Sequence, residues 1–375
     1  MSRFTGFVLT AFIIILITAP AQRLSAEAPD DQTTSTILIS QKLLDDVDLK
    51  TSWQIDLPFK KKENIDRMFI FDDYLYVLTD NNYIFCINRK KGKTRFGLQL
   101  AAKGLPICDP SYYDSKLIFM IGNRMRVLDS EKGVIAKSKY FKRIGTKAVC
   151  SAVRNAEHIF VAGVNKRLHA FTADEHLLDF PVTADNDSMI NSIIADDEVV
   201  VFSTRPGNVM CFVPAEKKRK WQSNIADGIV APLVRDGISL YVSSIDSKLH
   251  KLSIINGHSA WKAPFQAGQP LQKSAQVGKN IVYQHAGSKG LYAISKADGK
   301  MVWQQEEGQA LLAEVGRLAY IFVKPALLVI RDNITGKKLY SVNFADISDY
   351  AVNTKDRAIY VANGDGRVMS ITPKE

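Results

Sequence analysis

The chain has 375 residues, of which 46% are hydrophobic and 23% are charged, and its formal net charge at pH 7 is +10. This composition is that of a globular protein, and it excludes a disordered or fibrous chain. A basic net charge favours solubility and anionic partners but specifies no fold.

The first 28 residues have the features of a secretory signal. Arg3 is the only charge before an apolar run at residues 7–17, and small residues recur over residues 19–28. A short apolar segment between these flanks is typical of a signal peptide, and a spanning helix would need about 20 apolar residues. We therefore predict a periplasmic or secreted protein, with an uncleaved membrane anchor as the alternative. Cleavage is expected after Ala21 or Ala26, followed by a flexible linker at 29–42 and a folded body at 43–375.

The first predicted strand, residues 49–57, carries Trp53 and stands alone ahead of a repeat. The repeat is a unit of four short strands that recurs about every 40 residues. In its clearest copy the first three strands lie at 229–234, 240–242 and 249–254, and the fourth carries Trp261. Turn residues separate the strands and no helical periodicity is present, so the unit is predicted to be a small antiparallel sheet.

Two parts of the repeat are regular along the whole chain. The second strand occurs eight times, at residues 75–77, 117–119, 159–161, 199–201, 240–242, 281–283, 320–322 and 359–361. The last turn has a glycine followed four residues later by an aromatic, as in Gly92/Phe96, Gly257/Trp261, Gly299/Trp303 and Gly336/Tyr340.

The glycine allows a positive φ in a tight turn, and we expect the aromatic to pack between neighbouring sheets. All four tryptophans of the chain fall at this one position. In the second and third units Lys137 and Leu178 are expected in the place of the aromatic.

The ends of the chain predict how the repeats close. After a last strand at 367–371 the chain stops without a fourth strand, and the isolated strand at 49–57 would supply it. Closure leaves no unpaired sheet edge between the first and last units. We therefore predict an all-β, eight-bladed β-propeller of four-stranded antiparallel blades, with the N-terminal strand completing the C-terminal blade.

Three segments carry a family resemblance: LYAISKADGKMVWQ at 291–304, LHKLSIINGHSAW at 249–261 and LLVIRDNITGKKLY at 327–340. They resemble the repeat of the quinoprotein-like (PQQ-like) β-propeller superfamily, over about residues 43–375. Within it the chain is most similar to the non-enzymatic, BamB-type periplasmic branch, scaffolds of outer-membrane assembly. The resemblance implies a binding role toward an envelope or outer-membrane assembly protein, without a cofactor. BamB-type proteins are usually lipoproteins, whereas this chain has no lipobox cysteine.

Two other functions are compatible with a propeller of this kind. A divergent quinoprotein dehydrogenase would be expected to have adjacent cysteines and a calcium cage of oxygen ligands, and neither is visible. No His-Glu-x-x-His or Gly-x-Ser-x-Gly motif is present. A propeller that binds a small ligand or a glycan is the main alternative. We expect a monomer and no nucleic-acid partner.

The cysteines also follow the repeat. Cys86 and Cys211 align with Ala170 and Ala293, so they are expected to be small buried side chains. Cys108 and Cys150 are the only pair considered for a disulfide.

Basic residues recur at one turn of the repeat, between the second and third strands. This turn, or a position within a few residues of it, carries Arg124, Arg167, Arg205, Lys248, Lys289, Lys324 and Arg367. In a propeller such turns gather at one mouth of the channel, where a ring of charge would focus the field on an anionic partner. An acidic protein loop, a carboxylate-bearing glycan or an anionic lipid would suit it. The alternative is that these are ordinary polar turn residues of a basic protein.

Overall fold

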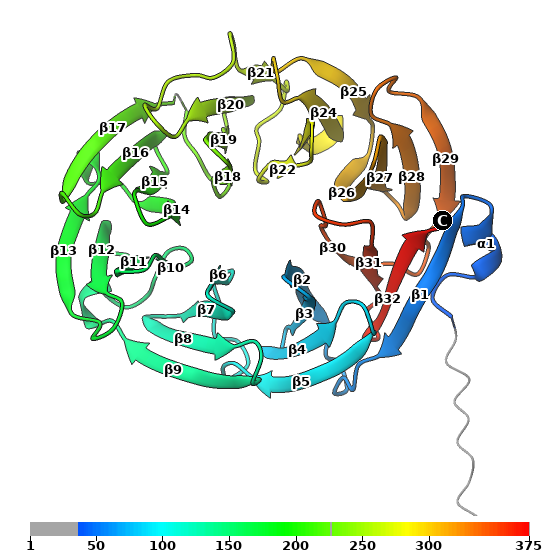
Figure 1. Cartoon of the computed structure of the whole chain (residues 1–375), viewed down its shortest axis with the longest axis horizontal. Helices are drawn as coiled ribbons and strands as arrows, with labels where there is room; N and C mark the ends of the chain where they lie inside the picture. The colour runs from blue at the N-terminus through cyan, green and yellow to red at the C-terminus, as the bar shows by residue number, and fades with distance from the viewer. Residues whose placement is uncertain (1–36, 226, 375) are drawn as a thin grey trace, which may run out of the picture. The chain divides into compact units, whose positions relative to one another are not determined.

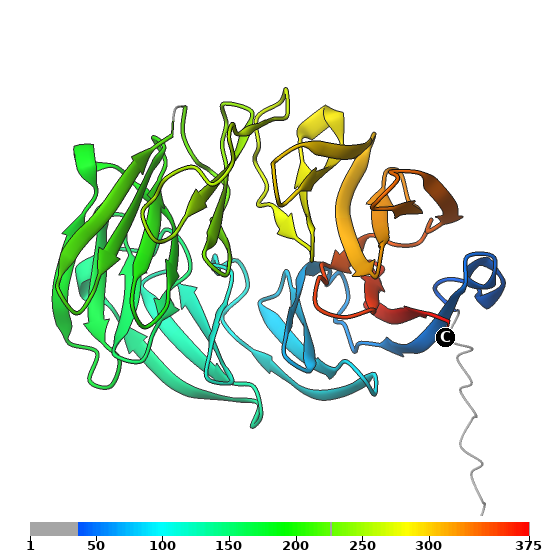
Figure 2. The same cartoon turned by 45° about the horizontal axis from the view of Figure 1, so that its top comes forward.

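The computed structural model describes residues 37–225 and 227–374, as eight four-stranded antiparallel sheets set around an axis (Figure 1). It confirms the predicted all-β, eight-bladed propeller. In each blade the first strand lies nearest the axis and the fourth forms the rim, and the tilted view shows the blades side by side around the ring (Figure 2). The predicted signal peptide lies outside the described residues.

The first four blades follow the chain in order. Blade 1 contains β2 (Ile65–Phe71), β3 (Tyr74–Thr79), β4 (Tyr83–Asn88) and β5 (Lys93–Gln99). Blade 2 contains β6 (Ser111–Tyr113), β7 (Lys116–Ile121), β8 (Arg124–Asp129) and β9 (Val134–Tyr140). Blade 3 contains β10 (Val153–Arg154), β11 (His158–Ala162), β12 (Arg167–Thr172) and β13 (Leu178–Thr183). Blade 4 contains β14 (Ile190–Ala195), β15 (Val200–Thr204), β16 (Asn208–Val213) and β17 (Lys218–Asn224).

The last four blades include the closing one. Blade 5 contains β18 (Val234–Asp236), β19 (Ser239–Ser243), β20 (Lys248–Ser253) and β21 (Phe265–Gln266). Blade 6 contains β22 (Gln276–Val277), β23 (Ile281–His285), β24 (Leu291–Ser295) and β25 (Met301–Gln305). Blade 7 contains β26 (Gly308–Val315), β27 (Leu318–Val323), β28 (Leu327–Asp332) and β29 (Lys338–Asn343). Blade 8 contains β30 (Asp349–Ala351), β31 (Ile359–Ala362), β32 (Arg367–Pro373) and, from the N-terminus, β1 (Leu49–Asp56).

The core of the propeller lies between the blades. Both faces of the second strands are buried, as Leu75, Tyr76 and Val77 in β3 illustrate with 0% exposure. In the cluster between blades 6 and 7, Tyr283 of β23 packs with Leu311 of β26. Continuous apolar strands of this kind are stable because each sheet is covered on both faces by its neighbours.

The repeated aromatic packs between neighbouring sheets, as predicted, and its contact there is the turn glycine of the next blade. A Cβ placed on Gly299 would lie 2.7 Å from Cδ2 of Trp261, and the same relation joins Gly92 to Trp53, Gly133 to Phe96, Gly257 to Trp221 and Gly336 to Trp303. The indole N–H of Trp261 donates to the carbonyl of Lys296 in blade 6 at 3.0 Å. The aromatic therefore fixes neighbouring blades through both packing and a hydrogen bond.

The prediction for the third blade was wrong by two residues. Ala170 pairs with Phe180, so the aromatic is Phe180 and not Leu178. The turn has no glycine, because His176 occupies the position with a φ of 61°, as Lys217 does in blade 4 with a φ of 51°. Lys137 does stand at the aromatic position of blade 2, where it pairs with Val127. Its Nζ lies 3.5 Å from Nδ1 of His176, so polar side chains replace the aromatic and the glycine at this interface.

The N-terminal strand closes the ring as predicted, with β1 paired to β32 from Leu49↔Pro373 to Asp56↔Arg367. The folded body begins before the expected boundary at residue 43. Leu38 and Ile39 are only 6% and 4% exposed, and α1 (Gln41–Asp45) follows them beside β29 and β1 (Figure 1). Two apolar side chains thus anchor a segment that was expected to be a linker.

The two ends of the folded body are joined to each other. The amide of Lys374 donates to the carbonyl of Asp48 at 2.8 Å, and its Nζ lies 2.9 Å from Oδ1 of Asp45. Asp48 has a φ of 55°. These contacts join β1 to the end of β32, the two strands of blade 8 that no turn connects.

Candidate functional site

The propeller has two unlike faces. We call the connection face the one that carries the segments joining successive blades together with the turns between second and third strands, and the hairpin face the opposite one. On the connection face the segments are tied to the turns: the amide of Ile229 donates to the carbonyl of Arg205 at 3.0 Å, and that of Ile245 to the carbonyl of Gly228 at 3.1 Å. The loops of this face are therefore held by backbone hydrogen bonds between adjacent blades.

Three of the seven predicted basic residues are held by local partners. Arg124 donates from Nε to Oγ of Ser138 at 2.7 Å and lies 4.9 Å from the ring centre of Tyr140, on the outer strand of its own blade. Lys248 contacts Asp246 of its own turn at 3.1 Å. Arg367 contacts Asp56 of the outer strand β1 at 2.9 Å. These contacts orient Arg124 and Arg367 toward the rim of the propeller.

The other four predicted residues are exposed: Arg167, Arg205, Lys289 and Lys324. Among the described residues, their charged groups have no hydrogen-bonded or ion-paired partner. A continuous ring of charge stays a prediction. Of the seven residues, Lys324 is the one whose charge acts on Lys273 and His285, which line the pocket described next.

A pocket of about 710 Å³ lies along the axis. Its wall comes from the inner strands and connections of blades 1, 2, 6, 7 and 8, with lining residues that include Arg67, Lys273, His285, Gln309 and Tyr350. Volumes of this size are typical of small-molecule sites. Sequence reasoning missed Lys273 and His285, because no motif marks them and only the fold of blade 6 turns both toward the axis.

In blade 6, the buried side-chain amide of Gln284 holds the wall of the pocket in place. Gln284 is fully buried, accepts from Oγ of Ser243 at 2.8 Å, and donates from Nε2 to the carbonyls of Lys273 at 2.9 Å and His285 at 3.0 Å. The two chain segments that carry Lys273 and His285 are therefore held together from inside the wall.

On this side of the pocket, the positive charges of Lys273 and Lys324 have no acidic partner among the described residues. Burial and the nearby ammonium groups of Lys273 and Lys324 lower the pKa of His285 to about 4, so its imidazole is neutral at pH 7. Burial and the charge of Lys324 also lower the pKa of Lys273. A positive charge that lowers the pKa of a neighbouring ammonium group in this way favours an anion beside that group.

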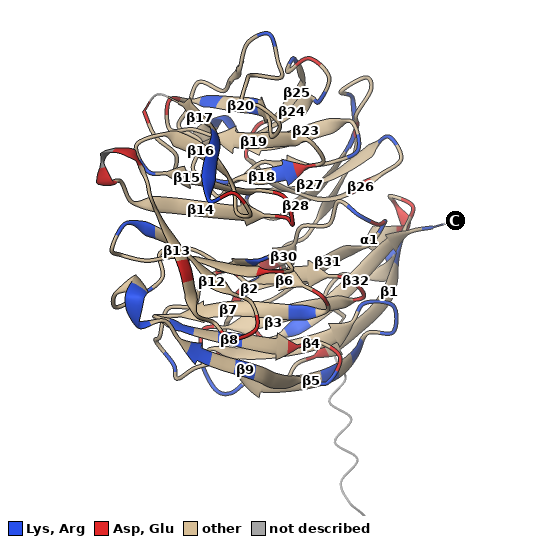
Figure 3. Ribbon diagram, turned by 60° about the vertical axis from the view of Figure 1, so that its left-hand side comes forward, with Lys and Arg blue, Asp and Glu red and all other residues tan. Residues whose placement is uncertain are grey.

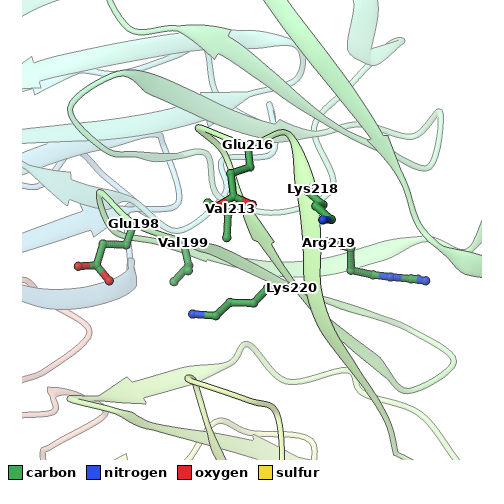
Figure 4. A pocket seen from close by; sticks show the side chains of 7 residues that line it. All are labelled: Glu198, Val199, Val213, Glu216, Lys218, Arg219 and Lys220. Atoms are coloured by element: carbon green, nitrogen blue, oxygen red, sulfur yellow. The ribbon is translucent and has the colours of Figure 1, made fainter.

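Elsewhere the charges are more dispersed. Figure 3 shows Lys and Arg at turns on both faces and along β17. A second pocket, of about 460 Å³, lies beside β17 on the hairpin face, lined by Val199, Val213, Glu198, Glu216, Lys218, Arg219 and Lys220. Figure 4 shows Lys220 and Arg219 extending in opposite directions. Arg219 contacts Asp185 at 3.3 Å and donates to Gln222 at 2.7 Å. Two acidic side chains, Glu198 and Glu216, stand against the remaining cations Lys218 and Lys220, so this groove has no dominant charge.

Exposed apolar side chains occur on both faces. On the connection face Val230 and Ile245 are 43% and 37% exposed, in loops that adjoin Arg205 of the preceding blade, blade 4. On the hairpin face of the same blade Ile238 and Ile255 are 64% and 54% exposed. Patches of this kind mark potential protein contacts.

The four cysteines pack in the apolar clusters between blades. Cys86 and Cys211 pair with Phe96 and Trp221, the position predicted from the repeat, and both are fully buried. Cys108 and Cys150 are free thiols that pack in different inter-blade clusters, between blades 2 and 3 and between blades 3 and 4. Within residues 37–225 and 227–374, no three His, Cys, Asp or Glu side chains form a group suited to a metal ion.

Comparison of the sequence with known protein families assigns the chain to one of them. The sequence profile of the outer membrane protein assembly factor BamB matches residues 42–263 and 221–375. The chain belongs to the BamB family. No curated protein sequence matches it.

Solved structures share the fold at low sequence identity. BamB from Moraxella catarrhalis superposes with a TM-score of 0.65 at 12% identity, over 86% of this chain and 97% of that chain. The computationally designed Ika8 protein gives a TM-score of 0.65 at 13% identity, over 84% and 98%. Over the part of the chain that the structure describes, no helix is both long and apolar enough to cross a membrane.

Proposed function

We propose that this member of the BamB family is a non-enzymatic periplasmic scaffold that binds a protein partner through its connection face, in outer-membrane protein assembly. The family match over residues 42–375 supports a binding role of this kind. The predicted signal peptide at 1–28, which lies outside the described residues, supports export.

The observation that carries the choice of face is the patch at blades 4 and 5. Val230 and Ile245 are apolar, exposed and held on backbone-bonded loops, and the exposed Arg205 stands beside them with its carbonyl bonded to Ile229. Apolar anchors next to an arginine are the composition that interface centres favour. Because the loops are already ordered by their hydrogen bonds, binding would lose little conformational entropy there.

The experiment compares two pairs of residues in one blade. The tagged protein is purified from solubilised envelopes as wild type, as Val230→Glu/Ile245→Glu, and as the matched control Ile238→Glu/Ile255→Glu on the hairpin face. We expect an outer-membrane assembly component to co-purify with the wild type and the control and to be lost from the connection-face variant. Thermal melts of all three proteins confirm that they are folded.

Two results would contradict the proposal. Loss of the partner from the hairpin-face control alone would assign binding to the opposite face. Recovery of the same partner by all three proteins would show that neither patch is the contact.

A further inference from the structure

We propose that the pocket on the axis is an anion site that takes a carboxylate, bound by the ammonium group of Lys273 beside His285, with Lys324 adding positive charge from the adjoining turn of blade 7. This inference does not rest on the scaffold role, because it concerns the pocket on the axis and not the apolar side chains of Val230 and Ile245.

The first argument is the charge left unpaired. Among the described residues, the ammonium groups of Lys273 and Lys324 have no acidic partner, yet each charge acts on the same imidazole, that of His285. On the other side of the pocket Arg67 is neutralised, since it contacts Asp66 at 2.8 Å and is also paired with Asp109. The excess positive charge is therefore confined to the side formed by blades 6 and 7.

The second argument is that the site is built before any ligand arrives. Gln284 holds the segments of Lys273 and His285 together from a fully buried position. In blade 7 the amide of Lys324 donates to the carbonyl of Glu307 at 3.1 Å, which fixes the start of its turn. A hydrogen bond from Oγ of Ser274 to the carbonyl of Pro232 at 2.8 Å anchors the residue after Lys273 to blade 5.

The third argument is the chemistry and size of the space. Ammonium groups bind carboxylates through short charge-assisted hydrogen bonds, and these are stronger in a recess than in open water. The neutral imidazole of His285 can donate or accept one more hydrogen bond. A volume of about 710 Å³ admits a small di- or tricarboxylate or the tip of an acidic loop. A small carboxylate and an acidic loop would both present a carboxylate group, and two probes distinguish these two sources.

The experiment uses citrate and a blocked pentaglutamate peptide as probes. Each is titrated into the purified protein at an ionic strength of about 0.01 M, where the Debye length is about 30 Å. The readout is the imidazole Cε1–Hε1 NMR signal of His285, assigned with His285→Asn. The test variant is Lys273→Gln/Lys324→Gln. The matched control is Arg167→Gln/Lys289→Gln, which removes two exposed cations of the connection-face turns outside the pocket.

We expect a saturable shift of the His285 signal with at least one probe. The double lysine variant should weaken binding by about tenfold or more, as expected for lost charge-assisted hydrogen bonds, and the control should bind within about twofold of the wild type. Binding of citrate alone identifies a diffusible carboxylate, and binding of the peptide alone an acidic loop. No saturable shift with either probe, or equal affinity in the double variant and the control, would overturn the proposal.

Discussion

Replacing Gly299 by alanine tests the packing on which the propeller depends. Gly299 has a φ of +75°, and an added Cβ would lie 2.7 Å from the ring of Trp261. Trp261 is 3% exposed and bonded to blade 6, so it cannot move away freely. The left-handed backbone costs alanine about 1–2 kcal/mol, and overpacking adds about 1–3 kcal/mol. We expect a loss of about 2–5 kcal/mol in the free energy of unfolding.

Gly316→Ala is the matched control for this prediction. Gly316 also has a positive φ, +61°, but apart from its own chain neighbours no residue lies within 4 Å of the Cβ position. Its loss should be only the backbone term of about 1–2 kcal/mol. Urea denaturation followed by tryptophan fluorescence gives both values. Equal losses in the two variants would refute the idea that the aromatic and the turn glycine lock adjacent blades.

Three further predictions follow from the structure. Deleting residues 43–60 should abolish cooperative unfolding, because β32 loses its partner β1 and becomes an open edge; a thermal melt like that of the parent would contradict ring closure. Asp179→Asn should cost about 1 kcal/mol or less at pH 7, because Asp179 is partly solvent-exposed. Hydrogen bonds from Lys217 and His158 hold the pKa of Asp179 below 3.8, so its contribution is present above that pH and disappears as the pH falls through the folded value. Urea titrations should therefore converge for the two proteins below about pH 4, and a constant difference down to pH 2 would count against this pairing. Finally, burial raises the pKa of Cys86 to about 12, so a thiol reagent at pH 8 should modify it only after unfolding; rapid labelling of the native protein would show that the thiol is accessible.

The repeat made most of the fold predictable from sequence. The aromatic of the fourth strand is visible in most blades because a turn glycine precedes it by four residues, and Trp53 could be assigned to the last blade because its strand stands alone ahead of the first complete unit. The rule failed at blade 3, where His176 adopts the glycine conformation with a φ of 61°. The aromatic, Phe180, was therefore overlooked.

The candidate site was much less predictable. Basic residues at one turn could be counted, but whether a cation is free depends on contacts between strands far apart in sequence. Arg367, for example, lies beside Asp56 only because the two ends of the chain share a blade. Lys273 and His285 belong to no motif, and their proximity to Lys324 depends on how blades 6 and 7 meet at the axis.

The most direct test of the scaffold role is photo-crosslinking in intact cells. A benzophenone amino acid is placed at Ile245 on the connection face or at Ile238 on the hairpin face, and the adducts are identified by mass spectrometry. A protein-binding connection face predicts one dominant adduct with an envelope protein from position 245 and little from position 238. Adducts from position 238 alone, or none from either position with the protein correctly exported, would contradict it.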